Sequence, residues 1–279
     1  MITRIPTRIQ RPDMRGDIRL VPLYSSSEGN STLVTVNGHH ILIDIGKNCK
    51  QCGLALQKAG VYPDDIEAVF LTHSHSDHIS GVSVFMKKYS TPVYATEPTL
   101  RRIDTQLMDL LHPIEEKSAT LFEDIGMRVL SYPTHHDATG SVVYRIENTL
   151  TGMSVCVMTD IGIVTVGLTE FCAGCDGGLF ESNYDPDMLE YGPYDYYLKK
   201  RIRGKGGHIS NFECAELVEF LLSGGTGKFV LGHISPINNT PEIARKTVCD
   251  YLASKGYEAG VDYELQTAPR SEPGKGFEL

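Results

Sequence analysis

The segment LTHSHSDHISG, residues 71–81, carries four side chains of types that bind metal ions, and they fall within six residues: His73, His75, Asp77 and His78. Imidazole and carboxylate groups are the ligands that Zn²⁺ and similar divalent ions take in proteins. The segment follows an apolar run that predicts a buried strand, and a loop at a strand end can direct several side chains to one point. The alternative is a solvated loop rich in histidine, which a total of only ten histidines disfavours.

Three later segments carry ligands of the same types. PTHHDA offers His135 and His136, whose side chains point opposite ways along an extended chain, so only one can readily be a ligand. SVCVMTDIG delivers Asp160 to a strand end, although an aspartate there could also simply start a turn. VLGHIS places His233 after a strand. Seven ligands are more than one tetrahedral ion needs, but they suit two ions. Two ions ~3.5–4 Å apart can activate a water molecule and stabilise the attacking and leaving oxygens of an in-line displacement.

Strands and helices must position these residues, and the apolar patterns predict both. Strands are expected at 18–24, 31–36, 39–46, 66–73, 92–95, 126–132, 141–147, 153–159, 178–185 and 228–233. Helices are expected at 49–60, from the metal-binding segment to about Tyr89, and at 99–111, 213–224 and 240–256. The mixture favours an α/β fold.

Length and composition indicate an ordinary globular chain. Its 279 residues predict an N-terminal extension over 1–17, a single domain over 18–270 and a loose tail over 271–279. No stretch has the ~18–20 apolar residues of a membrane span, and the N-terminus has no apolar core typical of a secretory signal. Seven scattered cysteines favour a reducing, cytoplasmic setting.

Some residues with chemical potential are interpreted as structural. The pairs Cys49/Cys52 and Cys172/Cys175 lie too far apart for the ~15–20-residue spacing of compact zinc modules, and in helices they would act as small apolar residues. The tyrosines of EYGPYDYY (190–197) could stack on bases, but packing is the preferred interpretation. The same holds for three histidines outside the motifs: His39, His40 and His112.

The motif HxHxDH, followed in order by PTHHDA, VMTDIG and VLGHIS, resembles the metallo-β-lactamase superfamily. The resemblance implies an αββα sandwich, in which two mixed β-sheets lie face to face with helices outside and metals at one edge. It implies two divalent ions, Zn²⁺ or Mn²⁺ with Fe also possible. One ion would be held by His73, His75 and His136, and the other by Asp77, His78 and His233, with Asp160 between them. Asp77 also counts as a catalytic residue. Asp44 in LIDIG would support the ligands from behind, and His135 would be a partly exposed neighbour.

Four segments resemble the bacterial WalJ (YycJ) group within that superfamily: YSSSEGNSTLV (24–34), PTHHDA, FESNYDPDMLEYGPYDYYLKKRI (180–202) and GGHISN (206–211). The similarity runs from about residue 18 to 255. It implies a DNA-processing hydrolase with 5′→3′ exonuclease activity on double strands. It also places Ser27 and Asn30 near the substrate, although a tight turn explains the glycine and asparagine of this loop equally well.

A run of positive charge precedes GGHISN in a chain whose net charge is −9. Its residues are Lys199, Lys200, Arg201, Arg203 and Lys205. They could grip backbone phosphates, or they could form a solvated helix face and loop. His208 follows them and is not one of the seven ligands. Phosphodiesterase branches of the superfamily carry a non-ligand histidine in this interval, which implies that His208 contacts the scissile phosphate or protonates the leaving oxygen. Alternatively it belongs to a helix start capped by Ser210 or Asn211.

Two rival functions remain open from the sequence. The acidic net charge favours a hydrolase for a small ester, lactone or cyclic phosphodiester. A metal-binding regulatory protein without turnover is the other rival, and the complete ligand set speaks against it.

Overall fold

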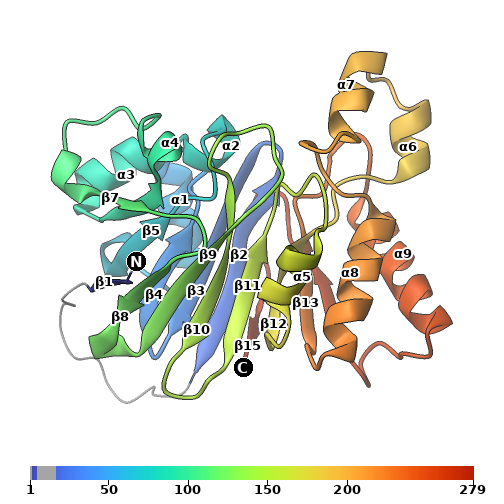
Figure 1. Cartoon of the computed structure of the whole chain (residues 1–279). Helices are drawn as coiled ribbons and strands as arrows, with labels where there is room; N and C mark the ends of the chain where they lie inside the picture. The colour runs from blue at the N-terminus through green and yellow to red at the C-terminus, as the bar shows by residue number, and fades with distance from the viewer. Residues whose placement is uncertain (1, 5–16) are drawn as a thin grey trace.

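Two mixed β-sheets lie face to face in the computed structural model, which describes residues 2–4 and 17–279 (Figure 1). The seven-stranded sheet has the order β15 (Phe277–Glu278), β2 (Ile18–Ser26), β3 (Gly29–Val36), β4 (His39–Ile43), β5 (Ile66–Phe70), β6 (Val93–Thr96) and β7 (Leu111–Ile114). The eight-stranded sheet has the order β1 (Ile2–Arg4), β8 (Ala119–Phe122), β9 (Met127–Pro133), β10 (Val142–Asn148), β11 (Ser154–Met158), β12 (Gly177–Glu181), β13 (Lys228–Gly232) and β14 (Glu264–Thr267).

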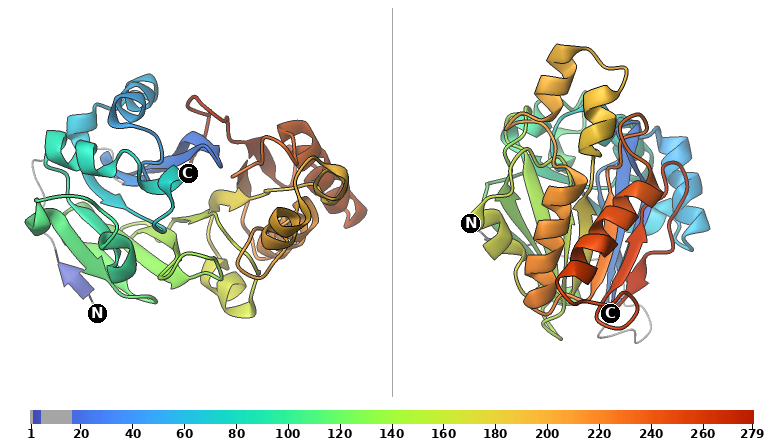
Figure 2. Two further views of the ribbon diagram at one scale, coloured as in Figure 1. Left: turned by 90° about the horizontal axis from the view of Figure 1, so that it is seen from above. Right: turned by 90° about the vertical axis from the view of Figure 1, so that its right-hand side faces the viewer.

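Helices cover the outer faces of both sheets (Figures 1 and 2). The α-helices are α1 (Cys49–Lys58), α2 (Ser76–Ile79), α3 (Val82–Tyr89), α4 (Glu97–Leu100), α5 (Val166–Cys172), α6 (Pro186–Tyr191), α7 (Tyr196–Ile202), α8 (Asn211–Ser223) and α9 (Pro241–Ser254). Short 3₁₀ turns are η1 (Pro63–Asp65), η2 (Met108–Leu110) and η3 (Glu123–Ile125). Within the described ranges, no helix is both long and apolar enough to cross a membrane.

Three apolar clusters hold the layers together, and strand alternation explains them. In β4, Ile41 and Ile43 point into the cluster between the sheets, while Leu42 points into the cluster under α1 and α3. In β13, Val230 faces the inter-sheet cluster, while Phe229 and Leu231 pack under α8 and α9. Both faces of each sheet are therefore buried, which confirms the predicted αββα sandwich.

Parallel pairing brings the functional loops to one edge. Strands β4 to β7 pair in parallel within one sheet, and β11 to β14 do so within the other. The carboxyl ends of parallel strands lie at the same edge of a sheet. The loops that follow β4, β5, β11, β12 and β13 therefore converge on the space where the two sheets meet.

The helix predicted over 99–111 is wrong. The only α-helix there is the end of α4, a 3₁₀ turn (η2) follows, and the segment ends in β7, which pairs with β6 through Leu111 opposite Val93. The amphipathic spacing of the apolar residues suits a helix, but the open edge of β6 offers backbone hydrogen bonds, and Ile114 reaches the inter-sheet cluster. Pro113 is compatible with this strand because β7 lies at the sheet edge.

Cysteines and histidines outside the motifs have structural surroundings. The pairs Cys49/Cys52 and Cys172/Cys175 are buried, and among the described residues they join none of the groups suited to hold a metal ion. Cys175 lies beyond the end of α5 rather than in a helix. Three histidines have local partners: His39 on Glu67, His40 on Thr35 and His112 stacked on Tyr94.

The ends of the chain belong partly to the sheets. Most of the predicted extension, residues 1 and 5–16, lies outside the described residues, while β1 pairs with β8. The prediction of a loose tail over 271–279 is wrong for its last residues. Phe277 pairs with Leu20, the amide of Leu279 donates to the carbonyl of Ile18, and the Phe277 ring is buried in the inter-sheet cluster.

Substituting Phe277 with alanine tests this C-terminal contact. Removing a buried aromatic ring typically costs about 3 kcal/mol of unfolding free energy, so we expect a clear fall in the melting temperature. Glu272→Ala, on the exposed part of the same segment, is the control and should change stability by less than about 0.5 kcal/mol. Equal melting temperatures for both variants would show that the segment is loose in solution.

Candidate active site

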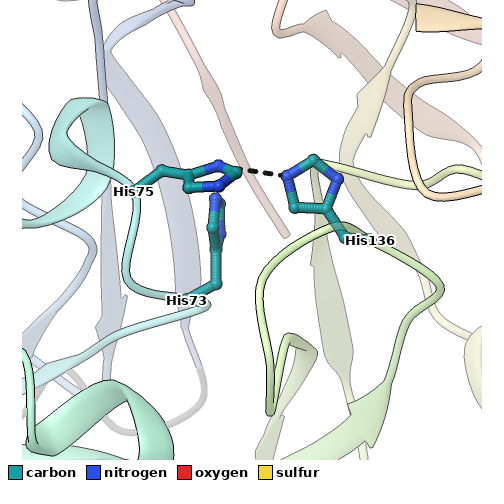
Figure 3. A group of neighbouring side chains, drawn as sticks. All are labelled: His73, His75 and His136. Carbon is teal, nitrogen blue, oxygen red and sulfur yellow. Dashed lines mark hydrogen bonds between the residues drawn. The ribbon is translucent and has the colours of Figure 1, made fainter. Parts of the chain in front are cut away.

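The candidate active site lies at the shared edge of the two sheets. His73 and His75 follow β5, and His136 follows β9. Figure 3 shows their rings turned toward one another, with Nε2 of His136 at 3.2 Å from Nδ1 of His75.

All seven residues predicted as ligands gather here, in two groups joined by a carboxylate. The groups are His73, His75 and His136, and Asp77, His78 and His233. Within each group the donor atoms lie within 4.8 Å of one another. Asp160 stands between the groups, with Oδ1 at 3.6 Å from Nε2 of His136 and Oδ2 at 3.1 Å from Nε2 of His78. The arrangement suits two metal ions that share one carboxylate.

Asp44 and Thr72 orient two of these histidines from behind. Nδ1 of His78 donates to Oδ2 of Asp44 at 2.7 Å, and Thr72 donates to the same oxygen at 2.8 Å. Nδ1 of His73 lies 3.0 Å from the Thr72 hydroxyl. Because Nδ1 carries the proton in each contact, Nε2 is left to face the centre of the site with its lone pair. Asp44 therefore lies behind the predicted ligand His78, in contact with its ring.

The other histidines are held in the same manner. Nδ1 of His136 donates to the carbonyl of Gly207 at 3.2 Å, and Nδ1 of His233 donates to Oε1 of Glu181 at 2.8 Å. His75 is turned the other way round, with Nε2 at 3.3 Å from Oδ1 of Asp137 and Nδ1 facing His136. Each ring therefore presents one nitrogen to the site and uses the other as an anchor.

Residues of this kind and geometry fit metal ions. Within the described part of the chain, Nε2 of His73 and Nε2 of His233 are buried and have no hydrogen-bond partner. Buried polar atoms of this kind cost free energy unless a ligand satisfies them. Burial lowers the pKa of His233, but the carboxylates of Asp160, Asp77 and Glu181 outweigh it and raise that pKa to about 10. These surroundings favour positive charge, which divalent cations supply.

Three site residues take a backbone conformation that L-residues rarely adopt. Asp44, Asp160 and His233 have φ values of 63°, 60° and 51°, and each stands just past the end of its strand. The left-handed conformation turns the chain sharply, so that the side chain enters the site instead of continuing the strand alternation. Such strain persists only where the surrounding structure holds it in place.

The loop SSSEGN reaches the site through its ends and not through its tip. Asn30 is buried, and its Nδ2 lies 3.1 Å from Nε2 of His78 and 3.4 Å from Oδ2 of Asp77. Ser25 accepts the backbone amide of His233 at 2.7 Å. Ser27 is exposed at the turn. Contact with the predicted ligands thus falls on Asn30, and Ser27 makes none of these contacts.

The basic run lies on α7 and the loop after it, and part of its charge is paired. Nε of Arg201 donates to Oδ2 of Asp137 at 2.6 Å. Lys199 donates to the carbonyl of Glu190 at 2.6 Å, and Arg203 pairs with the Glu190 carboxylate. Lys200 and Lys205 are exposed. The backbone of this loop lies against the site. The carbonyl of Gly206 accepts a hydrogen bond from the amide of Asp137, and a Cβ on Gly162 would lie 2.1 Å from the carbonyl of Lys205.

His208 stands between the basic run and the ligands. Its Nδ1 lies 2.8 Å from Oε1 of Glu181, the oxygen that also holds His233. The centroid of its ring is 5.1 Å from that of His233 and 5.4 Å from that of His136. The helix start predicted as the alternative is also present, because Ser210 and Glu213 form a capping box at α8. The caps do not use His208, so its ring remains available to the site.

Comparison with known proteins identifies the family. The Metallo-beta-lactamase superfamily profile matches residues 27–151. Exodeoxyribonuclease WalJ of Streptococcus pneumoniae is 34% identical over 257 residues, which cover 88% of this chain and 93% of WalJ. Exodeoxyribonuclease YycJ of Bacillus anthracis is 30% identical over 257 residues, which cover 91% of this chain and 96% of YycJ. The chain belongs to the metallo-β-lactamase superfamily. It is a metal-dependent hydrolase related to WalJ and YycJ, as the sequence motifs indicated.

Solved structures of the metallo-β-lactamase superfamily share the architecture. The metallo-β-lactamase-fold protein YhfI from Bacillus subtilis aligns with a TM-score of 0.67 at 16% identity, covering 94% of this chain and 99% of YhfI. Zn(2+)-bound PqqB from Methylobacterium extorquens aligns with a TM-score of 0.65 at 19% identity, with the same two coverages. At these identities the likeness confirms the fold alone.

Two site residues of this superfamily member escaped the sequence analysis. Glu181 is fully buried, holds His208 and His233, and accepts the amide of Ile161 at 2.7 Å. A signal was present, because Glu181 ends β12, and β12 pairs in parallel with β11 and β13, whose ends carry Asp160 and His233. Asp137 is the second such residue. Burial alone would raise the pKa of its carboxyl, but Arg201 and the neighbouring His136 hold that pKa below its usual range.

Metal content distinguishes the two histidines that follow Gly in the repeated string GHIS. His233→Ala removes a ring nitrogen that faces the site, so we expect the protein to lose roughly one bound ion per chain. His208→Ala should keep the full metal content, because Nδ1 of His208 is occupied by Glu181 and its ring is not needed by either three-residue group. Elemental analysis after dialysis measures both.

Thermal unfolding with and without a chelator is the companion measurement. The wild type and His208→Ala should lose stability on chelation, and His233→Ala should lose less. Donor atoms of His208 lie within 4.8 Å of those of Asp160, Glu181 and His233, so equal metal loss in both variants would show that His208 is itself a ligand.

Proposed function

We propose that this protein cleaves phosphodiester bonds in DNA as an exonuclease with two divalent ions, acting 5′→3′ on double strands. Similarity to two relatives named exodeoxyribonucleases supports DNA as the substrate. The duplex preference and the polarity rest on the resemblance of the four segments described above. The structural observation that carries the proposal is the place of His208, whose Nδ1 lies 2.8 Å from Oε1 of Glu181 beside the two three-residue groups, at the point where the basic run ends.

His73, His75 and His136 would hold one ion, and Asp77, His78 and His233 the other, with Asp160 shared. When bound, the two ions supply Lewis acidity and an activated water to the reaction. His208 would carry a proton on Nε2 and deliver it to the leaving oxygen, since Nδ1 is committed to Glu181. The Glu181 carboxylate would fix the ring and favour its protonated form, as a third group orients the acid–base residue in other hydrolases.

Two further features suit a phosphate substrate. Lys200 and Lys205 present exposed positive charge beside the site of a chain whose net charge is −9, and this local charge can attract the phosphates of a polyanion. Asn30 lies next to Asp77 and His78 and can position a non-bridging oxygen or a ligand carboxylate. Asp77 is the most solvent-open of the proposed aspartate ligands, with 21% of its side chain exposed, which places it toward the substrate.

Cleavage of duplex DNA labelled at the 5′ or the 3′ end, with Mn²⁺ or Zn²⁺ supplied, tests the function. We expect wild-type protein to release nucleotides from the 5′ end. Asp160→Ala should abolish turnover because it removes the carboxylate between the ligand groups. His208→Ala should slow turnover by about 10²–10⁴-fold, the range for loss of a general acid, while metal content is kept.

The same assay separates the rival functions. A small-ester, lactone or cyclic phosphodiester hydrolase would turn over such compounds and leave DNA intact. A regulatory protein would bind DNA without cutting it. Either outcome would contradict the proposal, and full activity of His208→Ala would contradict the proton-donating role alone.

Salt dependence tests the basic run. Lys200→Gln removes one exposed cation, so DNA affinity should fall, and the slope of log affinity against log salt should become shallower by about 0.7–0.9 if Lys200 contacts one phosphate. Lys255→Gln is the matched control. Lys255 is exposed at the end of α9, before β14 begins, and therefore lies at the edge of the sheet opposite the site. Identical slopes for Lys200→Gln and wild type would leave Lys200 without a phosphate contact.

A further inference from the structure

Helices α6 and α7 project from the two-sheet body, as the yellow-orange pair in Figure 1 and the right-hand view of Figure 2 show. Three tyrosines on this projection face solvent: Tyr191, Tyr196 and Tyr197 are 86%, 70% and 82% exposed. The prediction that these tyrosines pack is therefore wrong. Exposure of apolar aromatic surface to water is unfavourable, and a group of exposed rings commonly marks a binding surface.

Helix geometry places one of these rings in line with the active site. Residues four apart lie on the same face of a helix, about one turn or 5.4 Å apart. Tyr197 and Arg201 are so related, and Arg201 contacts Asp137, which in turn lies 3.3 Å from His75. Tyr197 therefore stands one turn further out than the residue that meets the ligand cluster.

Tyr196 and the exposed Lys200 form a second stripe beside the first, by the same four-residue spacing. The Tyr196 and Tyr197 rings are 5.7 Å apart between centroids and meet edge to face. Each stripe thus has an aromatic ring and, one turn further along α7, a positive charge. Such a combination is typical of surfaces that bind single-stranded nucleic acid, where rings stack on bases and cations track the backbone.

The projection is held in one orientation by its own contacts. Asp195 caps α7 through the amide of Leu198, and Asp185 caps α6. Lys199 links α7 to Glu190 of α6. Toward the body, the amide of His208 donates to the carbonyl of Ile202. A surface ordered before binding loses less conformational entropy when a ligand arrives.

We propose that Tyr197, with Tyr196 beside it, is a stacking platform for unpaired bases of a DNA strand end. This rests on the proposed nuclease function and narrows its substrate class. Bases inside a duplex already stack on one another, so an open tyrosine ring can take a base only where the strand end is unpaired. A strand whose phosphate lies at the ligand cluster would pass Arg201 and Lys200 and place its neighbouring bases on α7. The protein would therefore prefer DNA ends with an unpaired tail to blunt ends.

Binding to tails that lack bases separates stacking from charge. The probe is a fluorescent duplex with cleavage-resistant phosphorothioate linkages, ending either in a single-stranded oligothymidine tail or in an abasic tail of equal length and charge. Fluorescence anisotropy of the metal-loaded full chain gives Kd. For the wild type we expect about tenfold tighter binding to the thymidine tail, which is within the range of one stacked base. Tyr197→Ala should lose this difference, and Tyr197→Phe should keep it.

Tyr62→Ala is the matched control, because Tyr62 is 67% exposed but precedes β5 and so lies at the opposite edge of the sheet. It should behave as wild type. Equal Kd values for the two tails in wild type, or an unchanged difference in Tyr197→Ala, would overturn the stacking platform. Failure of unmodified DNA to be cut by wild type would overturn the proposed function instead. Because binding is measured on uncut DNA, the two failures can be told apart.

Discussion

Anchoring of the ring nitrogen that faces away from the site is the interaction on which the candidate active site depends. Asp44 and Thr72 hold His78 and His73, Glu181 holds His233, and a backbone carbonyl holds His136. Each contact selects a tautomer and turns a lone pair toward one space. Without these partners the five clustered rings would hydrogen-bond to one another or to water. The carboxylates behind the rings also add negative charge, which divalent cations at the site would balance.

This arrangement can be built only where two sheets end together. One sheet supplies Asp44, His73 and His78, and the other supplies His136, Asp160 and His233, so neither sheet has a complete site. Left-handed backbone at Asp44, Asp160 and His233 turns these side chains inward, and the inter-sheet core holds the strand ends that bear the strain. Close approach of loops is equally necessary: a Cβ at Gly46 would lie 1.6 Å from the carbonyl of Asp77.

The ligand cluster and the basic run are one connected structure. Asp137 touches both His75 and Arg201, and Glu181 touches both His233 and His208. Gly207 joins them again through its carbonyl bond to His136. Contacts thus run without a break from α7 to the groups that hold the clustered histidines, and the two copies of GHIS meet at one carboxylate. The two copies have the same sequence but different positions in the fold: His233 follows strand β13, and His208 follows the loop after α7.

The sequence by itself determined which residues could serve as ligands, their order and the strands that carry them, because apolar runs and a dense histidine motif are local patterns. It also determined the superfamily and the αββα fold through motif resemblance. Only the tertiary structure decided the rest. Leu111–Ile114 became a strand because β6 had an open edge, and Phe277 joined the core because β2 lay beside it. Glu181 and Asp137 joined the site, and Tyr196 and Tyr197 faced solvent, because strand pairing and helix placement bring together residues far apart in the chain. Such contacts leave no local pattern to read.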